Sequence, residues 1–449
     1  MTDLANIADL RHSALDLLAD WTPLRSIAGN ELGLRRMANL VAGHLRQTMG
    51  ATIVDAGLRF DPPVVHARID IGAPTTILLY NMYDVMPATS AGWSVDPFTG
   101  GIVEAPDGPR YVARGAENNK GPMAAMLVAA RHLLAKGALG ANLEILLEGQ
   151  EDTGSAQLRR YLTAKDTPVR KAAAALFPSF CEYGGGAPRI YYGFKGIAHG
   201  TISFESGGWG GPKTACHSSN SPWIANPAWS LIQALAQLAA GERGRGVIPP
   251  GLRPVLARLA ETFDPRAELA FRATERFSID GSAHDLLTHV LSAAHLNVSD
   301  LWTSPPAGRG IIPVTACARF DLRWPPGLDC EGELARLAVD CAPAELTVED
   351  AYPGRSFSPD ALGFQELVNT YNALGAAPQC WPWAIGAAPA YAFANLSEAF
   401  IIGGLGTGGN AHGVDEFVEL RGIDRFLQSL LLWLPALAVR AAAASRARS

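Results

Sequence analysis

The 449-residue sequence has no excess of positive charge, no cysteine motif and no long apolar run. Its 37 lysines and arginines against 43 acidic residues give a net charge of -6, which disfavours binding to nucleic acid or an anionic membrane. No stretch approaches the roughly 20 apolar residues of a membrane span. Residues 1–4 are polar and unlike a signal peptide. The six cysteines are scattered without CxxC spacing, so we expect reduced thiols and a cytoplasmic protein.

What is present is the composition of an ordinary globular chain, with 48% hydrophobic and 18% charged residues. At the usual ~100–200 residues per domain, the length predicts more than one domain. Helical spacing of apolar residues marks 9–20, 32–49 and 121–135. Apolar or β-branched runs mark strands at 52–54, 64–69, 76–80, 143–147 and 172–177. This alternation predicts an α/β sheet covered by helices on both faces.

The pattern changes after Gly196. A helix after Pro227, a strand at 311–322, a helix at 331–339 and a strand at 346–349 predict a small α+β unit. Residues 243–301 lack a clear pattern and are expected to form an irregular insertion. An α/β pattern returns after Gly354. Its last helix is expected at 422–434, with Pro435 ending or kinking it and a frayed tail from 440 to 449.

The most informative motif is Leu-Tyr-Asn-Met-Tyr-Asp-Val-Met-Pro at residues 79–87. It resembles the strand-end motif Leu-Tyr-Gly-His-x-Asp-Val-x-Pro of the di-zinc metallopeptidase family of aminoacylases, carnosinase-type dipeptidases and acetylornithine deacetylases. Segments at 113–122, 148–155, 188–196 and 410–417 resemble further motifs of that family, in the same order. Together they extend over most of the chain, which makes the resemblance far more specific than any single motif.

The resemblance implies a fold and an assembly. The expected fold is α/β, a zinc-peptidase-like three-layer catalytic domain with an inserted α+β lid and dimerisation domain. The catalytic-type domain would be discontinuous, made of residues 1–196 and 354–449, and the lid would comprise 197–353. A homodimer formed through the lid is the implied assembly.

The metal ligands of the family are only partly present. One metal of the pair is held in the family by a His, a bridging Asp and a distant Asp, which correspond here to Met82, Asn118 and Ser179. A thioether and a neutral amide are poor substitutes, so this half of the centre is predicted to be lost. The other metal would use Asn118, Asp152 and His412, acceptable ligands for one divalent ion, Zn or Mn. The same residues also suit a metal-free hydrogen-bonded cluster, and no cofactor is the favoured expectation.

Catalytic roles carry over by resemblance to three residues. Glu151 matches the general base that takes a proton from the attacking water. Asp84 matches a carboxylate that orients a ligand, against the alternative of a strand-end cap. His217 matches the histidine that reaches across a dimer to the oxyanion, and whether it acts within its own chain stays open. Cys216 beside it is expected to be a small buried hydrophobe, not a nucleophile.

The substrate side is better kept than the metal side. Arg323 matches an arginine that clamps a substrate carboxylate, with a surface strand residue as the alternative. Gly386 lies in a segment, 383–389, that lacks the polar groups of its family counterpart, so an apolar pocket is expected there. Asn118 and Met82 would also contact the substrate.

Three functions are compatible with this pattern. The first is a repurposed enzyme that performs metal-independent chemistry at an amide or acyl centre of a small amino-acid-like or peptide-like substrate, by acyl transfer, amide formation or elimination. The second is a single-metal amidohydrolase or dipeptidase. The third is a non-catalytic binding or regulatory homologue.

Overall fold

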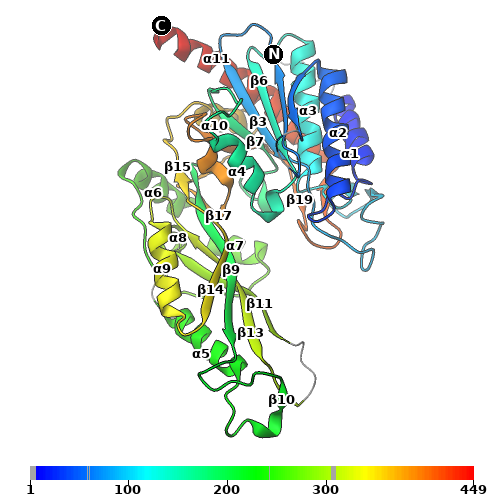
Figure 1. The fold of residues 1–449 in the computed structure, drawn as a ribbon. Coiled ribbons are helices and arrows are strands. Elements are labelled where there is room, and N and C mark those ends of the chain that lie inside the picture. The colour runs from blue at the N-terminus through cyan, green and yellow to red at the C-terminus, as the bar shows by residue number, and fades with distance from the viewer. Residues whose placement is uncertain (1–6, 58, 60, 242, 305–309, 449) are drawn as a thin grey trace.

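The computed structural model describes residues 7–57, 59, 61–241, 243–304 and 310–448, so the polar start at residues 1–4 lies outside it. Figure 1 shows a broad upper body, which holds both marked chain ends, and a narrower arm below it. The α/β part of the sequence forms the body, and the α+β part forms the arm.

Six strands form the central sheet of the body in the order β1-β2-β6-β3-β7-β18. β3 runs parallel to β6 and β7, and β18 runs parallel to β7, while β1 and β2 form an antiparallel edge. The central strands are nearly continuous apolar runs, because they are buried on both faces. The bounds are β1 Thr52–Ala56, β2 Val65–Ile69, β3 Thr76–Met82, β6 Asn142–Glu148, β7 Ala175–Pro178 and β18 Phe400–Gly403.

Helices cover this sheet on both sides. In Figure 1, α1, α2 and α3 lie along one side, where α1 contacts both α3 and α11, and α4 lies on the other. Local signals set the ends of α2, since the Asn30 side chain accepts from Gly33 N and Gly50 takes a left-handed φ of 65°. The predicted α/β fold class is confirmed. The helices are α1 Ile7–Trp21, α2 Glu31–Met49, α3 Lys120–Ala135, α4 Ala156–Thr163, α10 Phe364–Ala373 and α11 Leu420–Arg448.

The last helix corrects the expectation for the C-terminus. α11 continues through Pro435 to Arg448 instead of ending near residue 434. Leu437 and Ala441, beyond the proline, are 0% and 2% exposed, so burial of this face holds the helix together past the missing N–H. By length and composition α11 could also cross a membrane, which corrects the expectation that no stretch of the sequence approaches a membrane span. Here 56% of its most apolar window is buried inside the body.

A small second sheet joins distant parts of the body. Its order is β19-β20-β5-β4, and the antiparallel pair β5 and β20 places residues 113–120 beside residues 410–416. Two of the predicted motifs therefore meet, although about 300 residues of sequence separate them. The bounds are β4 Gly101–Val103, β5 Arg110–Val112, β19 Gly408–Gly409 and β20 Phe417–Glu419.

The arm contains the predicted α+β unit. Its antiparallel sheet has the order β11-β13-β9-β14, and α5 packs on β9 and β13. A separate hydrophobic cluster, which includes Phe320, Trp324 and Leu231, forms its core. The boundaries proposed at residues 197 and 353 stay a prediction. The elements are β9 Gly193–Glu205, β10 Cys216–His217, α5 Pro227–Ala240, β11 His295–Ser304, β12 Ile311–Ile312, β13 Thr315–Trp324, α9 Cys330–Asp340 and β14 Glu345–Tyr352.

The stretch expected to be irregular contains three α-helices, a short 3-10 helix and part of β11. Asp264 caps α7 ahead of Pro265, and Ser282 forms a capping box with Asp285 at the start of α8. Buried residues of α6 and α8 join the core of the body and not that of the arm. The stretch therefore fills the junction between body and arm. Its helices and the short strands nearby are α6 Arg253–Thr262, α7 Pro265–Phe271, α8 Ala283–Ser292, β8 Arg189–Tyr191, β15 Arg355–Ser356, β16 Gln379–Trp381 and β17 Ala384–Ala387.

Candidate active site

The acidic motifs meet where the parallel strands β3 and β6 end. Met82 is opposite Glu148 in the register, so the residues that follow both strands emerge at one edge of the sheet. Glu151 and Asp152 lie in a 3-10 turn just beyond β6. The backbone N–H of Asp152 donates to Asp84 Oδ2 at 3.0 Å. The structure thus brings together the carboxylates that the sequence analysis singled out.

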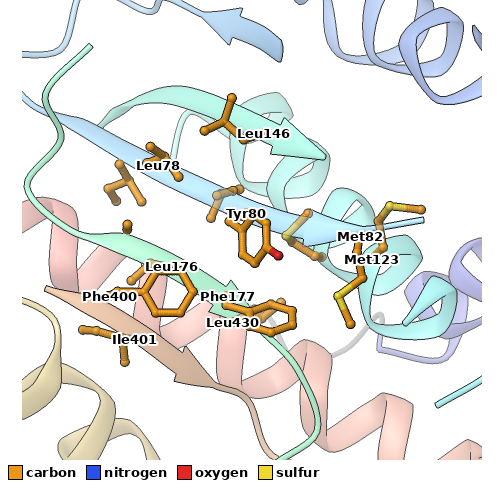
Figure 2. Close-up of a cluster of buried hydrophobic side chains, with 14 of the residues drawn as sticks. Leu78, Tyr80, Met82, Met123, Leu146, Leu176, Phe177, Phe400, Ile401 and Leu430 are labelled. Carbon is orange, nitrogen blue, oxygen red and sulfur yellow. The ribbon is translucent and has the colours of Figure 1, made fainter. Parts of the chain in front are cut away.

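Met82 lies in the hydrophobic core. Its side chain is 4% exposed and belongs to the cluster drawn in Figure 2, which also contains Tyr80 and Met123. The thioether sulfur accepts a hydrogen bond from Asn119 Nδ2 at 3.7 Å. Methionine fills apolar gaps well, and its sulfur is a weak acceptor. This burial leaves little surface for the substrate contact that the sequence analysis assigned to Met82.

Asn118, Asp152 and His412 form a contact triangle. His412 Nε2 lies 2.6 Å from Asn118 Nδ2 and 3.2 Å from Asp152 Oδ1. The contact with Asp152 raises the pKa of His412, although partial burial opposes the shift. Both carboxylate oxygens of Asp152 are buried, Oδ1 forms the ion pair with His412, and Oδ2 has no hydrogen-bond partner within the described residues. The three residues predicted as the second ligand set are therefore together in space.

A buried ion pair holds this triangle in place. Glu416 is fully buried and accepts a hydrogen bond from Arg114 Nη1 at 2.6 Å. Its two oxygens also accept from the backbone N–H groups of Gly115, Glu117 and Asn118 at 3.0, 3.0 and 2.8 Å. Arg114 Nη2 donates to the carbonyls of His412 and Gly413 at 3.1 and 3.0 Å. One carboxylate and one guanidinium thus fix the two segments that carry Asn118 and His412.

Burial dominates the electrostatics of the acidic groups. It raises the pKa of Glu148 to about 7, although Tyr80 Oη donates to Glu148 Oε1 at 2.6 Å. Burial and the charges of Asp84, Asp152 and Glu148 raise the pKa of Glu151 well above its usual range. The pKa of Asp84 rises for the same reasons. Closely spaced buried carboxylates cannot all ionise, so the site favours shared protons or a bound cation.

The side chains present do not fit the family's pair of metals. Met82 packs in the core, and Ser179 offers no acid where the distant Asp would lie. The nearby alternatives are occupied or protonated: Glu182 pairs with Arg425 at 2.6 Å, and burial raises the pKa of the Cys181 thiol to about 12. Within the described residues, no group of three His, Cys, Asp or Glu side chains is placed to hold a metal.

A single cation fits the remaining set better. Asp152 offers two buried oxygens, of which Oδ1 lies 3.2 Å from His412 Nε2 and Oδ2 has no hydrogen-bond partner within the described residues. Asn118 would have to turn its amide oxygen inward, because Nδ2 now faces the imidazole. Two strong ligands and one neutral amide make a weaker site than that of a four-ligand metalloenzyme.

His217 lies far from these carboxylates in the single chain. It ends β10, at the tip of the arm in Figure 1, whereas β3 lies in the body. The side chain is exposed, and its Nδ1 lies 2.9 Å from Ser219 Oγ. One chain therefore does not bring His217 to Glu151.

Arg323 and Gly386 lie at the junction of body and arm. Arg323 is on β13, its side chain is 35% exposed, and its Nε donates to Asp321 Oδ2 at 3.1 Å. Gly386 is on β17, and a Cβ at this position would meet no atom within 4 Å. Both positions therefore have open space beside them.

Two features of the site were missed from the sequence. Glu117 lies next to Asn118, and burial together with the charge of Glu416 raises the pKa of its carboxyl to about 7. The string 113–122 places this acid one residue before the family's bridging Asp, a signal that was available. The second feature is Arg159, whose guanidinium stacks over Tyr352 at 4.8 Å. This contact joins the end of the arm to the body, and no pattern in the nearby sequence predicts it.

A helix-covered α/β body, an inserted antiparallel arm and carboxylates at the ends of parallel strands define a zinc-peptidase-like protein. The sequence pattern of Peptidase family M20/M25/M40 matches residues 78–434, and the chain belongs to this family.

Relatives are similar to this chain in sequence, and solved structures are similar to it in fold. The chain is 26% identical over 356 residues to the Cys-Gly metallodipeptidase DUG1 of Candida albicans, covering 72% of this chain and 71% of the relative. It is 25% identical over 319 residues to the Beta-Ala-His dipeptidase of Mus musculus, covering 66% and 61%. The fold is similar to the M20 family metallo-carboxypeptidase Sso-CP2 of Sulfolobus solfataricus, with a TM-score of 0.79, 23% identity and coverage of 95% and 99%. It is also similar to the dipeptidase Dug1p of Saccharomyces cerevisiae, with a TM-score of 0.77, 20% identity and coverage of 97% and 98%.

Proposed function

We propose that this protein acts on an amide or acyl centre of a small amino-acid-like or peptide-like substrate without the family's pair of metal ions. The observation that carries the proposal is the uneven set of site residues. Met82 and Ser179 remove one half of the metal centre, whereas Glu151 and Asp84 are retained at the ends of their strands. Two relatives are named as a Cys-Gly metallodipeptidase and a Beta-Ala-His dipeptidase, and these names support a small peptide-like substrate.

The chemistry of the site limits the reaction. A pair of metals would supply a hydroxide from water at neutral pH, and without it water is a poor nucleophile. An amine nucleophile or an activated acyl substrate needs less help, so acyl transfer, amide formation or elimination fits better than hydrolysis. The raised pKa of Glu151 favours its protonated form, which can donate to a leaving group and then accept the proton of the nucleophile. Arg323 would hold the carboxylate of the substrate.

The proposed assembly is a homodimer through the arm. Two large apolar side chains of α5 are exposed to solvent, Trp229 by 66% and Ile232 by 50%. Trp223, which precedes the helix, is 78% exposed. β11 is an edge strand of the arm's sheet and exposes 58% of Leu301. Exposed apolar groups of this size favour association. In such a dimer, His217 of one copy would supply the oxyanion donor to the other.

A second candidate is a single-metal amidohydrolase. It is favoured by the buried Asp152, whose Oδ2 lacks a hydrogen-bond partner in the described part of the chain, and by His412, which lies 3.2 Å from Oδ1. When bound, one divalent ion would polarise a carbonyl oxygen or a water molecule. The residues that would hold it are Asp152, His412 and Asn118.

The test combines metal analysis with a panel of reactions. Protein purified without added metal is analysed for Zn and Mn, then assayed on dipeptides and on thioesters of amino acids with and without an amine acceptor. The first proposal expects transfer to the amine that persists after chelator treatment. Bound metal at about one equivalent, with activity lost to chelator, supports the second candidate instead.

Glu151→Gln is the matched variant, and Glu261→Gln on α6, an exposed position, is its control. Whether the enzyme is metal-independent or uses one metal, Glu151→Gln should lower its activity by about 100-fold or more. Glu261→Gln should leave the activity unchanged. An activity that survives Glu151→Gln refutes the assigned acid/base role. The absence of every activity, together with tight binding of a dipeptide, would identify a non-catalytic homologue.

A further inference from the structure

A cavity of about 360 Å³ lies at the junction of body and arm. α7 and α8 contribute one wall, and strands β9, β13, β16 and β17 contribute the other. Much of the lining is apolar and includes Phe263, Leu286, Leu287, Trp381 and Ile385. Ile385 precedes Gly386, so the cavity adjoins the segment that the sequence analysis expected to form an apolar pocket.

A buried lysine faces this apolar lining. Lys195 on β9 is 1% exposed, and its ammonium donates to the carbonyl of Ala293 at the end of α8 at 3.0 Å. No ion pair joins Lys195 to an acid within the described residues. An ammonium has three donors, and a buried one without an anion is costly. Arg323, whose Nε pairs with Asp321 Oδ2 at 3.1 Å, lines the same cavity and adds a second cation.

His295 supplies an independent sign of a missing ligand. Its Nε2 is buried without a hydrogen-bond partner in the part of the chain that the structure describes. The ring lines the cavity and lies 5.2 Å from the ring of His289, centroid to centroid. Burial and the charge of Lys195 lower the pKa of His295 to about 4, so the imidazole is neutral. A neutral ring nitrogen in this position needs a polar partner.

The acid in the lining does not supply the missing anion. Glu268 on α7 pairs with Arg189 and, at 3.0 Å, with Arg272. The contacts with these arginines lower the pKa of Glu268 even though burial opposes the shift, and its charge is already balanced. The cavity therefore combines apolar walls with an excess of positive charge.

We propose that this cavity binds the acid half of the substrate, an amino acid with a bulky aromatic or branched apolar side chain. The carboxylate of the ligand lies between Lys195 and Arg323, and its side chain packs against the apolar walls of the cavity. An amide N–H of the ligand donates a hydrogen bond to His295 Nε2. This inference rests on the proposed function for the identity of the ligand as substrate. It adds Lys195, His295 and the walls from α7 and α8 to the recognition of that substrate.

Binding of a carboxylate should be accompanied by protonation of Lys195, which makes the affinity depend on pH. Burial and the charge of Arg323 lower the pKa of Lys195 to about 7, and a bound carboxylate would raise it. Affinity for the anion should therefore fall as pH rises above 7, by up to tenfold per pH unit, until the pKa of the bound state is reached. The other ionisable groups lining the cavity are Arg323, His289, His295, Glu268 and Arg272. His289 and His295 both have lowered pKa values and carry little charge above pH 7.

The test is calorimetric titration of the full chain carrying Glu151→Gln, which prevents turnover. Three probes separate the contributions: N-acetylphenylalanine, N-acetylglycine, which lacks the side chain, and N-acetylphenylalanine amide, which lacks the charge. We expect N-acetylphenylalanine to bind roughly tenfold or more tightly than either of the others. Equal affinity for the acid and its amide, or no binding of the acid, overturns the inference.

Lys195→Met tests whether the ammonium of Lys195 binds the carboxylate. Lys171→Met, at an exposed lysine of the body, is the control. Lys195→Met should weaken N-acetylphenylalanine roughly tenfold, abolish the pH dependence above pH 7 and leave the amide probe unchanged. A variant that merely unfolds loses all three probes, and the melting temperature checks this. Unchanged affinity and pH profile in Lys195→Met contradict the assignment. If Glu151→Gln abolishes turnover but the acid probe does not bind, the proposed function survives and only the cavity assignment fails.

Discussion

The most informative single change in the body is Glu416→Gln. Glu416 is 0% exposed and accepts from Arg114 and from the backbone N–H groups of Gly115, Glu117 and Asn118. The amide keeps the shape of the carboxylate but removes its charge, and one of its two acceptors becomes a donor. Arg114, 3% exposed, then keeps only its bonds to two carbonyls of the segment that carries His412.

Breaking a buried ion pair costs about 3–5 kcal/mol, and the surviving carbonyl bonds to Arg114 favour the lower figure. A loss of about 3 kcal/mol in the local opening free energy corresponds to amide exchange on the order of 100-fold faster. Hydrogen exchange measured by mass spectrometry on peptides that contain residues 113–119 reports this directly. Peptides from the arm are the internal reference, because their core is separate.

The reasoning fails if exchange in residues 113–119 changes less than about threefold in Glu416→Gln, since the pair would then contribute little to local stability. Glu261→Gln, on the exposed side of α6, is the matched control and should leave exchange unchanged. The same acceleration in arm peptides would show global destabilisation, and the local argument would be refuted.

Three further outcomes are expected. Combining Met82→His, Asn118→Asp and Ser179→Asp should restore zinc binding, measured as metal content after dialysis, and unchanged content would contradict the account of the lost half-centre. The pKa of Lys195 is about 7 in the folded chain, against an ordinary value of 10.5. Between these two pH values the unfolded chain binds more protons than the folded chain. The free energy of unfolding therefore rises with pH, by about 1.4 kcal/mol per pH unit. The gain in melting temperature from Lys195→Met should therefore be largest at and below pH 7 and shrink toward pH 10; a gain that stays constant from pH 7 to 10 refutes the linkage. Trp229→Glu should convert the proposed dimer to a monomer in light scattering, whereas an unchanged mass would exclude α5 from the interface.

The sequence predicted those parts of the fold that depend on local pattern. Apolar runs located β3 and β6, and because both are parallel strands, the motifs that follow them had to meet at one edge of the sheet. The contact between Asp152 and Asp84 follows from that register. The interpretation of Met82 as a lost metal ligand came from residue chemistry alone and stays a prediction.

Long-range contacts account for what was missed. The Arg114–Glu416 pair joins segments 302 residues apart, and no periodicity reports such a contact. The body core holds α11 past Pro435, which overrides the local cost of the proline. In the junction, the capping residues of α7 and α8 were visible, but their short apolar patterns gave no sign that these helices enclose a cavity.

β9 is one continuous strand that pairs with β17 at the junction and with β13 and β14 in the arm. Its first residues, Phe194 and Lys195, pair with β17, while Gly196 onward pairs with β13 and β14 of the arm. If the arm rotated while these strand pairings stayed intact, β9 would rotate with it, and so would the ammonium of Lys195. The position of Lys195 in the junction cavity is therefore tied to the orientation of the arm through one continuous strand.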